Sequence, residues 1–219
     1  AYNGDAFDEP SSDSPGYGEN PPAVGIDFFE GPYQDSDDLD NPLTEVFTDA
    51  IDSLGIPYEG IGIGYGDGVV DNERFGMRRF VYYNNSGNNI NGEPTTPLHY
   101  YNYMNGIWKN GQKMAYGGDG VSAATGANLD ISCDYMFPGE TDPYNWGTVG
   151  VSTEPWTEVS SGNPPADRRF IQSAGPFVLE PGDYNNITMG VVWARASAGD
   201  PFESVKLLRQ ADDKAQALF

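Results

Sequence analysis

The chain has 219 residues, and its 38% hydrophobic content is enough to bury a core. Its 33 acidic residues against 11 basic ones give a net charge of −22, which disfavours nucleic-acid binding because the phosphate backbone carries the same sign. The single cysteine excludes an intrachain disulfide, and no apolar run is long enough for direct membrane insertion as a helix. The 28 Gly and 17 Pro argue against long helices, so a mainly β fold is expected.

The N-terminal segment differs from the rest in composition. Residues 1–22 are rich in Asp, Glu, Ser, Pro and Gly and hold few apolar residues, so we expect an extended acidic segment or linker. Residues 23–219 are expected to form a single β-rich module. Because its last helical pattern runs to Phe219 without a stop signal, we also expect this module to be truncated at its C-terminal end relative to a larger parent protein.

Two short helices are expected in the module. Asn41 stands where an N-cap belongs and Pro42 at the first helical position, and apolar residues then repeat on one helical face, which predicts a helix over about 43–54. The second predicted helix covers about 201–219, where Pro201 again stands at the start and apolar residues share one face.

Alternating and β-branched stretches between turn-forming residues predict strands. The clearest pattern is a β-hairpin of 169–179 and 186–195 with a turn at 180–183. Further strands are expected at 24–29, 60–65, 77–84 and 129–137. The aromatic stretch 98–116 fits either paired strands or a short helix. The expected architecture is therefore β-sandwich-like, with antiparallel sheets and long loops rich in Gly, Pro and Asn.

Two acidic segments form the candidate metal site. Segment 35–41 places several carboxylates close together, as a loop that wraps calcium requires, and Asp27 lies just upstream. Segment 66–73 resembles the latter half of an EF-hand or dockerin loop, but non-ligating residues occupy the first two ligand positions and Arg74 the last, so only an irregular site remains. The alternative is that both segments are solvated acidic turns. The candidate calcium ligands are Asp27, Asp35, Asp37, Asp38, Asp40, Asp67, Asp71 and Glu73.

Few residue patterns indicate catalysis. His99 is the only histidine, so a His-rich zinc site is impossible within the chain, and a Ser-His-Asp or Cys-His mechanism would have to use it. Its neighbours lack a nucleophile-elbow pattern, and we expect a packing role for His99 and burial for Cys133. Glycoside hydrolysis by a pair of carboxylates is not excluded, because acidic residues are abundant, although no pair of them stands in a recognisable sequence context. We therefore expect a chain that is not an enzyme.

Aromatic residues offer a second candidate function. Flat Trp and Tyr rings can stack on sugar rings, although the favoured interpretation is that they fill the core of a Gly-rich β fold. The candidate glycan-binding platforms are Tyr101, Tyr103, Trp108, Trp146 and Trp156.

One resemblance emerges at the C-terminal part. The stretch 167–183, the strand that ends at Arg195 and the helix containing 211–219 are similar to a segment of large secreted proteins of Bacteroidota. Those proteins resemble type IX secretion substrates, and 25–35 and 67–77 also look similar to them. The resemblance implies export to the outer-membrane exterior and a multidomain parent, and it supplies no catalytic residue.

The sequence thus predicts a non-catalytic, calcium-stabilised structural or adhesive module of a secreted or cell-surface bacterial protein. Its expected partners are other domains of the same parent protein or surface proteins, with glycans as further candidates. The alternatives are a glycan-binding module and an accessory domain of a secreted hydrolase.

Overall fold

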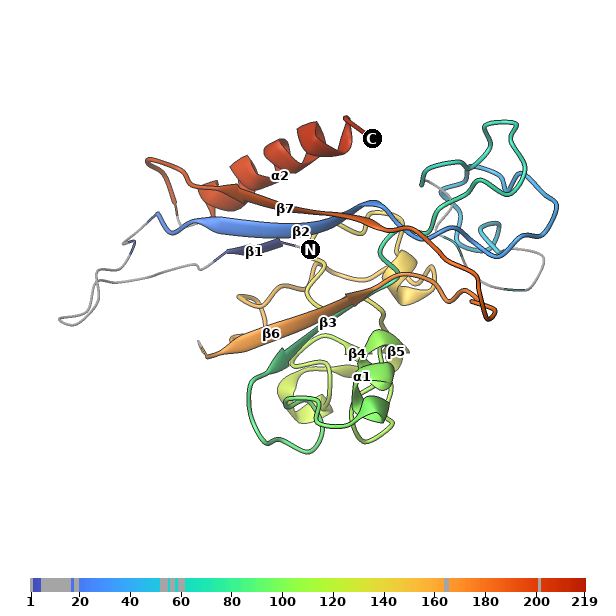
Figure 1. The fold of residues 1–219 in the computed structure, drawn as a ribbon. Helices are drawn as coiled ribbons and strands as arrows, with labels where there is room; N and C mark the ends of the chain where they lie inside the picture. The colour runs from blue at the N-terminus through green and yellow to red at the C-terminus, as the bar shows by residue number, and fades with distance from the viewer. Residues whose placement is uncertain are drawn as a thin grey trace. The chain divides into compact units, whose positions relative to one another are not determined.

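The computed structural model describes residues 2–4, 17, 20–51, 55, 58, 62–163, 166–200 and 202–219. They form small antiparallel sheets, two α-helices and long loops (Figure 1). The chain divides into two compact units, Ala1–Gly31 with Tyr184–Phe219 and Pro32–Asp183, where the sequence predicts a single module. Much of the expected linker 1–22 lies outside the described residues.

The first unit is a three-stranded antiparallel sheet packed against a helix. Strand β2 (Ala23–Glu30) lies between β1 (Tyr2–Gly4) and β7 (Thr188–Ala194). Helix α2 (Glu203–Gln216) packs on β2 and β7, and its Leu208 is fully buried (Figure 1). The predicted strand 24–29 and the predicted C-terminal helix are confirmed, with the helix a few residues shorter than expected.

Glycine lets two segments of this unit approach closely. Gly190 of β7 faces the ring of Phe29, and a Cβ at Gly190 would lie 2.0 Å from that ring. Phe29 in turn stacks on Phe219, with ring centroids 5.1 Å apart. Along the other face of β7, Met189, Val191 and Trp193 stay exposed.

The second unit contains two two-stranded antiparallel sheets. Strand β3 (Arg79–Asn84) pairs with β6 (Arg168–Ser173), and β4 (Ala115–Tyr116) pairs with β5 (Asn128–Ser132). Helix α1 (Pro97–Met104) begins after Thr96, whose hydroxyl accepts the His99 N–H. The predicted strand 77–84 is confirmed in β3. The ambiguous aromatic stretch holds a short helix in its first half, because Pro at the start and a capping hydroxyl fix the first turn.

An aromatic core lies in this second unit. Trp108 is fully buried, meets Tyr103 edge to face with centroids 5.7 Å apart, and donates from Nε1 to the Gly120 carbonyl at 2.8 Å. Gly120 has a φ of 76°, and a Cβ there would lie 3.1 Å from the indole ring, so glycine admits the Trp. We call the buried residues of this cluster the aromatic core: Val81, Tyr83, Tyr103, Trp108, Met114, Cys133, Met136 and Trp156.

The predicted helix 43–54 is wrong over residues 43–51, and 52–54 lie outside the described residues. Residues 47–49 form a single turn, and the Val46 N–H is bonded by the Thr44 hydroxyl, a local contact that competes with helix formation. Leu43 and Val46 are 62% and 51% exposed, so the periodic apolar positions do not form one buried face. A short helix without a packed face is not stable.

The predicted β-hairpin is also wrong, although both of its strands form in part. Strand β6 pairs with β3 and β7 pairs with β2, so the two segments have different partners. The predicted turn at 180–183 does form, with the Asp183 N–H donating to the Glu180 carbonyl at 2.9 Å, but it does not bring the two strands together. Earlier in the connection, Phe177 packs against a cluster around buried Tyr58. The local pattern identified extended segments but not their partners.

Two further expectations differ from the structure. Residues 62–65 form turns, with Gly64 at a φ of 90°, and 60–61 lie outside the described residues, so a strand at 60–65 is wrong where it can be checked. Strand β5 covers only the start of the predicted strand 129–137. Sheets of two and three strands among the described residues are the coarse architecture, and a β-sandwich is not observed.

Candidate functional site

The two acidic segments lie against each other, although about thirty residues separate them in the sequence. The Asp71 N–H donates to the Leu39 carbonyl at 3.1 Å, and the Gly66 N–H donates to the Asn41 carbonyl at 2.9 Å. We call segments 35–41 and 66–73 together the acidic loop pair.

Carboxylates of one acidic loop accept backbone N–H groups of the other. Asp71 Oδ1 accepts from the N–H groups of Asp37 at 2.7 Å and Asp38 at 3.1 Å. The buried Glu73 accepts from the Asn41 N–H through Oε1. Hydrogen bonds to ionised acceptors are about twice as strong as neutral ones, so these carboxylates fix the conformation of segment 35–41.

At Asp40 the roles of the two loops are reversed, because a carboxylate of segment 35–41 accepts backbone N–H groups of segment 66–73. Its Oδ1 and Oδ2 accept from the N–H groups of Gly66 and Gly68, both at 2.8 Å. Asp67 caps its own turn by accepting from the Val69 N–H at 2.8 Å. The two loops are therefore crosslinked in both directions, and the acidic residues satisfy backbone groups of long loops that lack a sheet.

The side chains of Asp35, Asp27 and Asp38 do not take part in the crosslinks between the two acidic loops. Asp35 accepts the Val178 N–H through both carboxylate oxygens, at 2.8 and 3.0 Å. Asp27 belongs to the first unit, where burial and the nearby carboxylate of Asp212 raise its pKa. Asp38 offers its exposed side chain to solvent. Within the described ranges, no group of three or more His, Cys, Asp or Glu side chains is arranged to hold a metal ion.

Most of the predicted glycan-binding platforms are core residues. Trp108, Trp146 and Trp156 are at most 4% exposed, and Tyr103 is fully buried, so these four rings cannot present a face to a sugar. Tyr101, at 62% exposure on α1, is the exception. Their burial agrees with the favoured interpretation of the aromatic residues as core.

Cys133 and His99, the candidate nucleophile and base, both have structural roles. The thiol of Cys133 lies in the aromatic core, and burial raises its pKa, which disfavours the reactive thiolate. His99 Nδ1 lies 3.3 Å from both the N–H and the hydroxyl of Thr95 at the start of α1. Among the described residues, no hydrogen bond joins the Cys133 thiol to the His99 imidazole.

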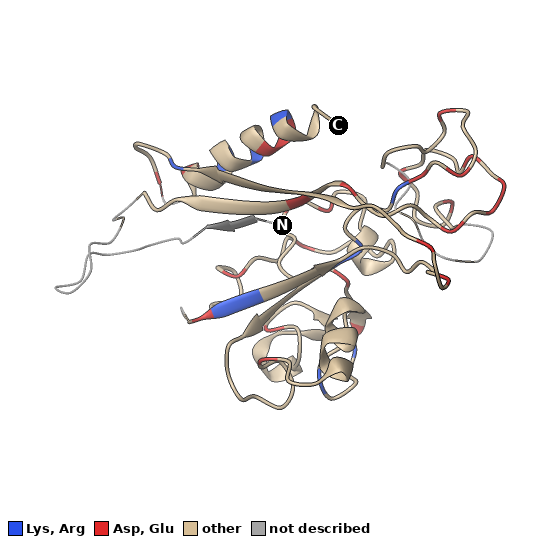
Figure 2. Cartoon of the chain, viewed as in Figure 1, with Lys and Arg blue, Asp and Glu red and all other residues tan. Residues whose placement is uncertain are grey.

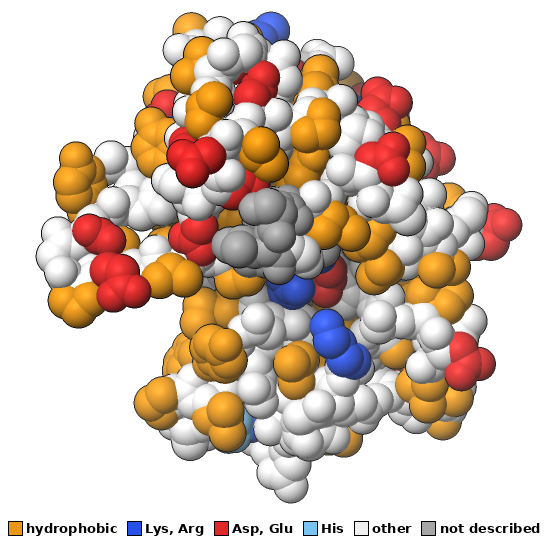
Figure 3. All heavy atoms as spheres, turned by 90° about the vertical axis from the view of Figure 1, so that its right-hand side faces the viewer, with side chains coloured by type: hydrophobic (Ala, Val, Ile, Leu, Met, Phe, Trp, Pro, Cys, Tyr) orange, Lys and Arg blue, Asp and Glu red, His pale blue; other side chains and the backbone are white. Residues whose placement is uncertain are grey.

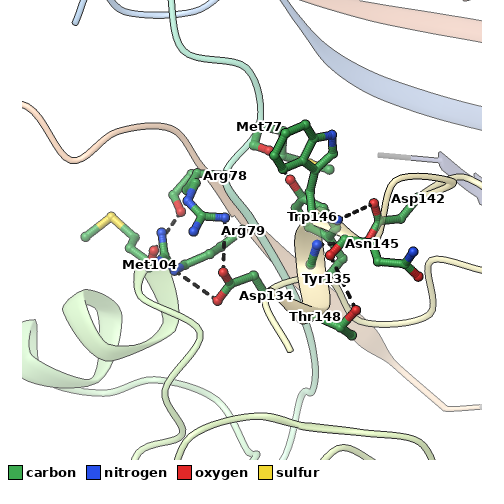
Figure 4. Close-up of polar contacts among 12 residues, drawn as sticks. Met77, Arg78, Arg79, Met104, Asp134, Tyr135, Asp142, Asn145, Trp146 and Thr148 are labelled. Carbon is green, nitrogen blue, oxygen red and sulfur yellow. Dashed lines mark hydrogen bonds and ion pairs between the residues drawn. The ribbon is translucent and has the colours of Figure 1, made fainter. Parts of the chain in front are cut away.

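Sequence reasoning missed a buried charge cluster in the second unit (Figure 4). Asp134, itself 5% exposed, receives Arg78 Nη1 at 3.1 Å on one oxygen and Arg79 Nε at 3.4 Å on the other. The Asp134 backbone bonds the same strand, β3, and one further segment, because its carbonyl accepts the Phe80 N–H and its N–H donates to the Gly147 carbonyl. Two adjacent arginines in a chain with only 11 basic residues were the available signal.

A half-buried carboxylate, that of Asp142, organises the neighbouring loop. Asp142 accepts the N–H groups of Trp146 and Gly147, both at 2.8 Å, which holds the 3-10 turn at Trp146–Thr148 in place (Figure 4). Burial raises the pKa of Asp142, while the two backbone N–H groups act in the opposite direction. The carboxylate is thus a loop anchor.

Acidic residues lie mainly in loops (Figure 2). On the face drawn in Figure 3, acidic side chains are scattered among apolar and neutral ones instead of forming one continuous patch. This distribution fits the local role of the carboxylates as acceptors for loop backbone.

The second unit also contains a cavity of about 640 Å³ that sequence reasoning did not find. It lies between the end of β3, the Asn-rich loop that follows β3, the turn around Asp119 and the segment before β6. Its described lining is Tyr82, Tyr83, Asn84, Asn88, Ile90, Asn91, Asp119, Val121, Thr125, Met136, Ser161, Gly162, Asn163, Ala166 and Arg168. The run of asparagines from 84 to 91 was the sequence signal.

Comparison with known proteins gives no match to a protein-family model, a curated protein or a solved structure. Among the described helices, neither has the length and apolar character needed to cross a membrane.

Proposed function

We propose that this chain is a non-catalytic structural or adhesive module of a secreted or cell-surface bacterial protein, stiffened by its acidic loop pair. The observation that supports this most directly is the use of Asp71, Asp40 and Glu73 as acceptors for backbone N–H groups of the opposite loop. Because these carboxylates hold the backbone of long loops in place by hydrogen bonds, the loops form a rigid surface of irregular backbone. Such a surface suits contact with other domains or with surface proteins.

Calcium is the proposed stabiliser of the loop pair. Asp71 and Glu73 each accept backbone N–H groups through one oxygen, and Asp38 holds an exposed carboxylate beside them. Calcium takes six to eight oxygen ligands in flexible geometry, including waters and backbone carbonyls. Since no group of three or more such side chains is arranged for a metal among the described residues, the proposal requires these carboxylates to move together around the ion. The dense negative charge of the two loops favours a divalent cation.

Thermal melting tests the calcium part. We expect calcium to raise the melting temperature over that in a chelator, because a ligand at 100 times its Kd stabilises the folded state by about 2.7 kcal/mol. Magnesium at the same concentration controls for general screening, and Asp71→Asn should reduce the calcium effect. If calcium left the melting temperature unchanged, the calcium proposal would be wrong, and the hydrogen bonds of the acidic loop pair alone would account for its stiffness.

Surface display tests the cellular part. In intact bacteria that carry the full parent protein, added protease should cleave this region, whereas a cytoplasmic marker in the same cells should stay intact. Protection until the cells are lysed would contradict an outer-membrane exterior location. Export by the type IX route rests on the resemblance of 167–183 and the following strand and helix to secreted Bacteroidota proteins, and loss of surface exposure in a strain lacking that secretion system is the expected result.

The alternative of an accessory domain of a secreted hydrolase receives less support. Asp134 is paired with two arginines and Asp142 accepts two backbone N–H groups, so both of these carboxylates already have structural partners. A glycan-binding role through the tryptophans is disfavoured by their burial.

A further inference from the structure

The cavity of the second unit has the size of a ligand site. Its volume of about 640 Å³ falls within the range of about 300–1,000 Å³ that is typical of small-molecule pockets. It shares no residue with the acidic loop pair and none with the arginine–aspartate cluster around Asp134. A ligand here would therefore be a function separate from loop stiffening.

Three asparagine side chains on the cavity wall have carboxamides without hydrogen-bond partners among the described residues. Asn84, Asn91 and Asn163 are each half-buried, and their backbone groups are used, for example in the bond from the Asn84 N–H to the Asn91 carbonyl at 3.1 Å. Their carboxamides make no hydrogen bond to any other residue in the described part of the chain. Partly buried amides in this state need water or a ligand, and three of them converge on one space.

Asp119 presents a fixed acceptor to the same space. Its Oδ1 accepts from the N–H groups of Val121 at 2.9 Å and Ser122 at 3.1 Å and from the Thr125 hydroxyl. These three bonds hold the carboxylate in one orientation. Its Oδ2 has no hydrogen-bond partner among the residues that the structure describes, so it remains an acceptor for a ligand.

The rest of the lining is apolar or balanced in charge. Ile90, Val121 and Met136 provide aliphatic surface. The Tyr82 ring is held by a hydrogen bond from its hydroxyl to Glu158 at 3.0 Å, and the Arg168 guanidinium carbon lies 6.0 Å from its centroid. Arg168 and Asp119 are the charged members of the described lining, and their charges cancel.

We propose that this cavity binds a neutral saccharide. Each sugar hydroxyl is both a donor and an acceptor, and carboxamides offer both functions, while a carboxylate oxygen accepts strongly from hydroxyls. The C–H faces of a sugar ring match the aliphatic wall and an aromatic ring. An anionic ligand is disfavoured because the lining has no surplus positive charge and the chain carries a net charge of −22.

Calorimetric titration of the whole chain tests the proposal with maltotetraose, cellotetraose, mannotetraose and chitotetraose as neutral probes and tetragalacturonate as the anionic probe. The double variant Asn84→Ala/Asn163→Ala removes two cavity amides, and Asn89→Ala removes an exposed amide of the same loop that does not line the cavity. We expect at least one neutral probe to bind, with affinity about tenfold or more weaker in the double variant, since each lost hydrogen bond costs about 0.5–1.5 kcal/mol. The Asn89→Ala variant should bind as the unaltered chain does.

Three results would overturn the assignment. The first is the absence of binding to every neutral probe at about 10 mM, which is weaker than a functional site would show. The second is binding that the double variant retains in full, and the third is tighter binding of tetragalacturonate than of any neutral probe. Melting curves of both variants establish that they are folded, and the calcium response of the loop pair is measured separately, so failure here leaves the structural proposal intact.

Discussion

The aromatic core and the acidic loop pair lie in the same unit but hold their segments together by different means. In the aromatic core, Trp108 and Tyr103 lose all exposure, and stability comes from apolar burial, with the indole N–H and the phenol hydroxyl bonded to backbone carbonyls. In the acidic loop pair, Asp71 and Asp40 remain partly exposed, and each accepts backbone N–H groups of the other loop, which is distant in the sequence. The first arrangement is insensitive to charge, whereas the second depends on it.

The acidic loop pair shows how a strongly acidic chain folds with little regular structure. Long loops leave many backbone N–H groups without sheet or helix partners, and each unsatisfied buried group costs about 1–3 kcal/mol. Carboxylates are acceptors with several lone pairs, so acidic residues serve such loops well. The predictions below separate burial from hydrogen bonding in order of expected effect.

The largest effect is expected for Trp108→Ala. It empties the centre of the aromatic core and leaves the Gly120 carbonyl without its indole donor, so we expect a loss of about 5 kcal/mol in the free energy of unfolding. Urea denaturation followed by circular dichroism gives the value. The matched control is Trp193→Ala, because Trp193 is 62% exposed on β7 and should change stability by no more than about 0.5 kcal/mol. Equal losses in the two variants would contradict the burial argument.

Asp134→Asn tests charge inside the core region. It leaves the guanidinium groups of Arg78 and Arg79 without a counter-charge, and removal of one partner from a buried ion pair costs about 3 kcal/mol or more. The control is Glu203→Gln, which breaks a pair with Lys206 at the surface of α2 and should change the melting temperature little. A variant of Asp134 as stable as the unaltered chain would show that the cluster contributes no net stability.

Asp71→Ala tests the acidic loop pair. It removes the acceptor for the N–H groups of Asp37 and Asp38, and we expect a loss of about 2 kcal/mol, together with faster hydrogen exchange at those two amides. Asp71→Asn retains a carbonyl acceptor and tolerates the observed φ of 57°, so it should lose less than the alanine variant. If both variants were as stable as the unaltered chain, the side-chain oxygen would have no role, whereas an equal loss in both would assign the effect to the carboxylate charge.

Some of the strands, the final helix and the acidic segments could be predicted from the sequence. The strand at 24–29, the strand at 77–84 and the final helix follow from local periodicity, which survives because each buries its apolar face against a neighbour. The acidic segments 35–41 and 66–73 stood out by composition. Their sequence could not show that they lie together or that backbone N–H groups of the opposite loop take up their oxygens, because both facts depend on tertiary contacts.

The failures have the same physical origin. Residues 43–51 carry a helical pattern, yet the loop contact from the Gly66 N–H to the Asn41 carbonyl and the local bond at Thr44 compete with it. The cavity could not be foreseen because Asn84, Asp119 and Asn163 come from three distant segments. The sequence showed an Asn-rich loop but not what it would face.

The smallest effect is expected at Asp27, where burial outweighs hydrogen bonding. Burial and the nearby Asp212 carboxylate raise the Asp27 pKa above its ordinary value of 3.8, so ionisation of Asp27 destabilises the first unit. The stability linked to the protonated form is complete below 3.8 and is lost as the pH rises through the raised pKa. Asp27→Asn imitates the neutral form, and we expect a modestly higher melting temperature than that of the unaltered chain at neutral pH.

A series of melting curves from acidic to neutral pH, recorded in chelator, measures this effect, because the gain from Asp27→Asn should vanish below 3.8, where both side chains are neutral. Asp130→Asn, at an exposed position of β5, is the control and should leave the pH profile nearly unchanged. A lower melting temperature for Asp27→Asn at neutral pH would show that the carboxylate is stabilising. Because the chelator removes bound divalent cations, the hydrogen bond from the Phe28 backbone N–H, which acts to lower the Asp27 pKa, would then outweigh the cost of burial.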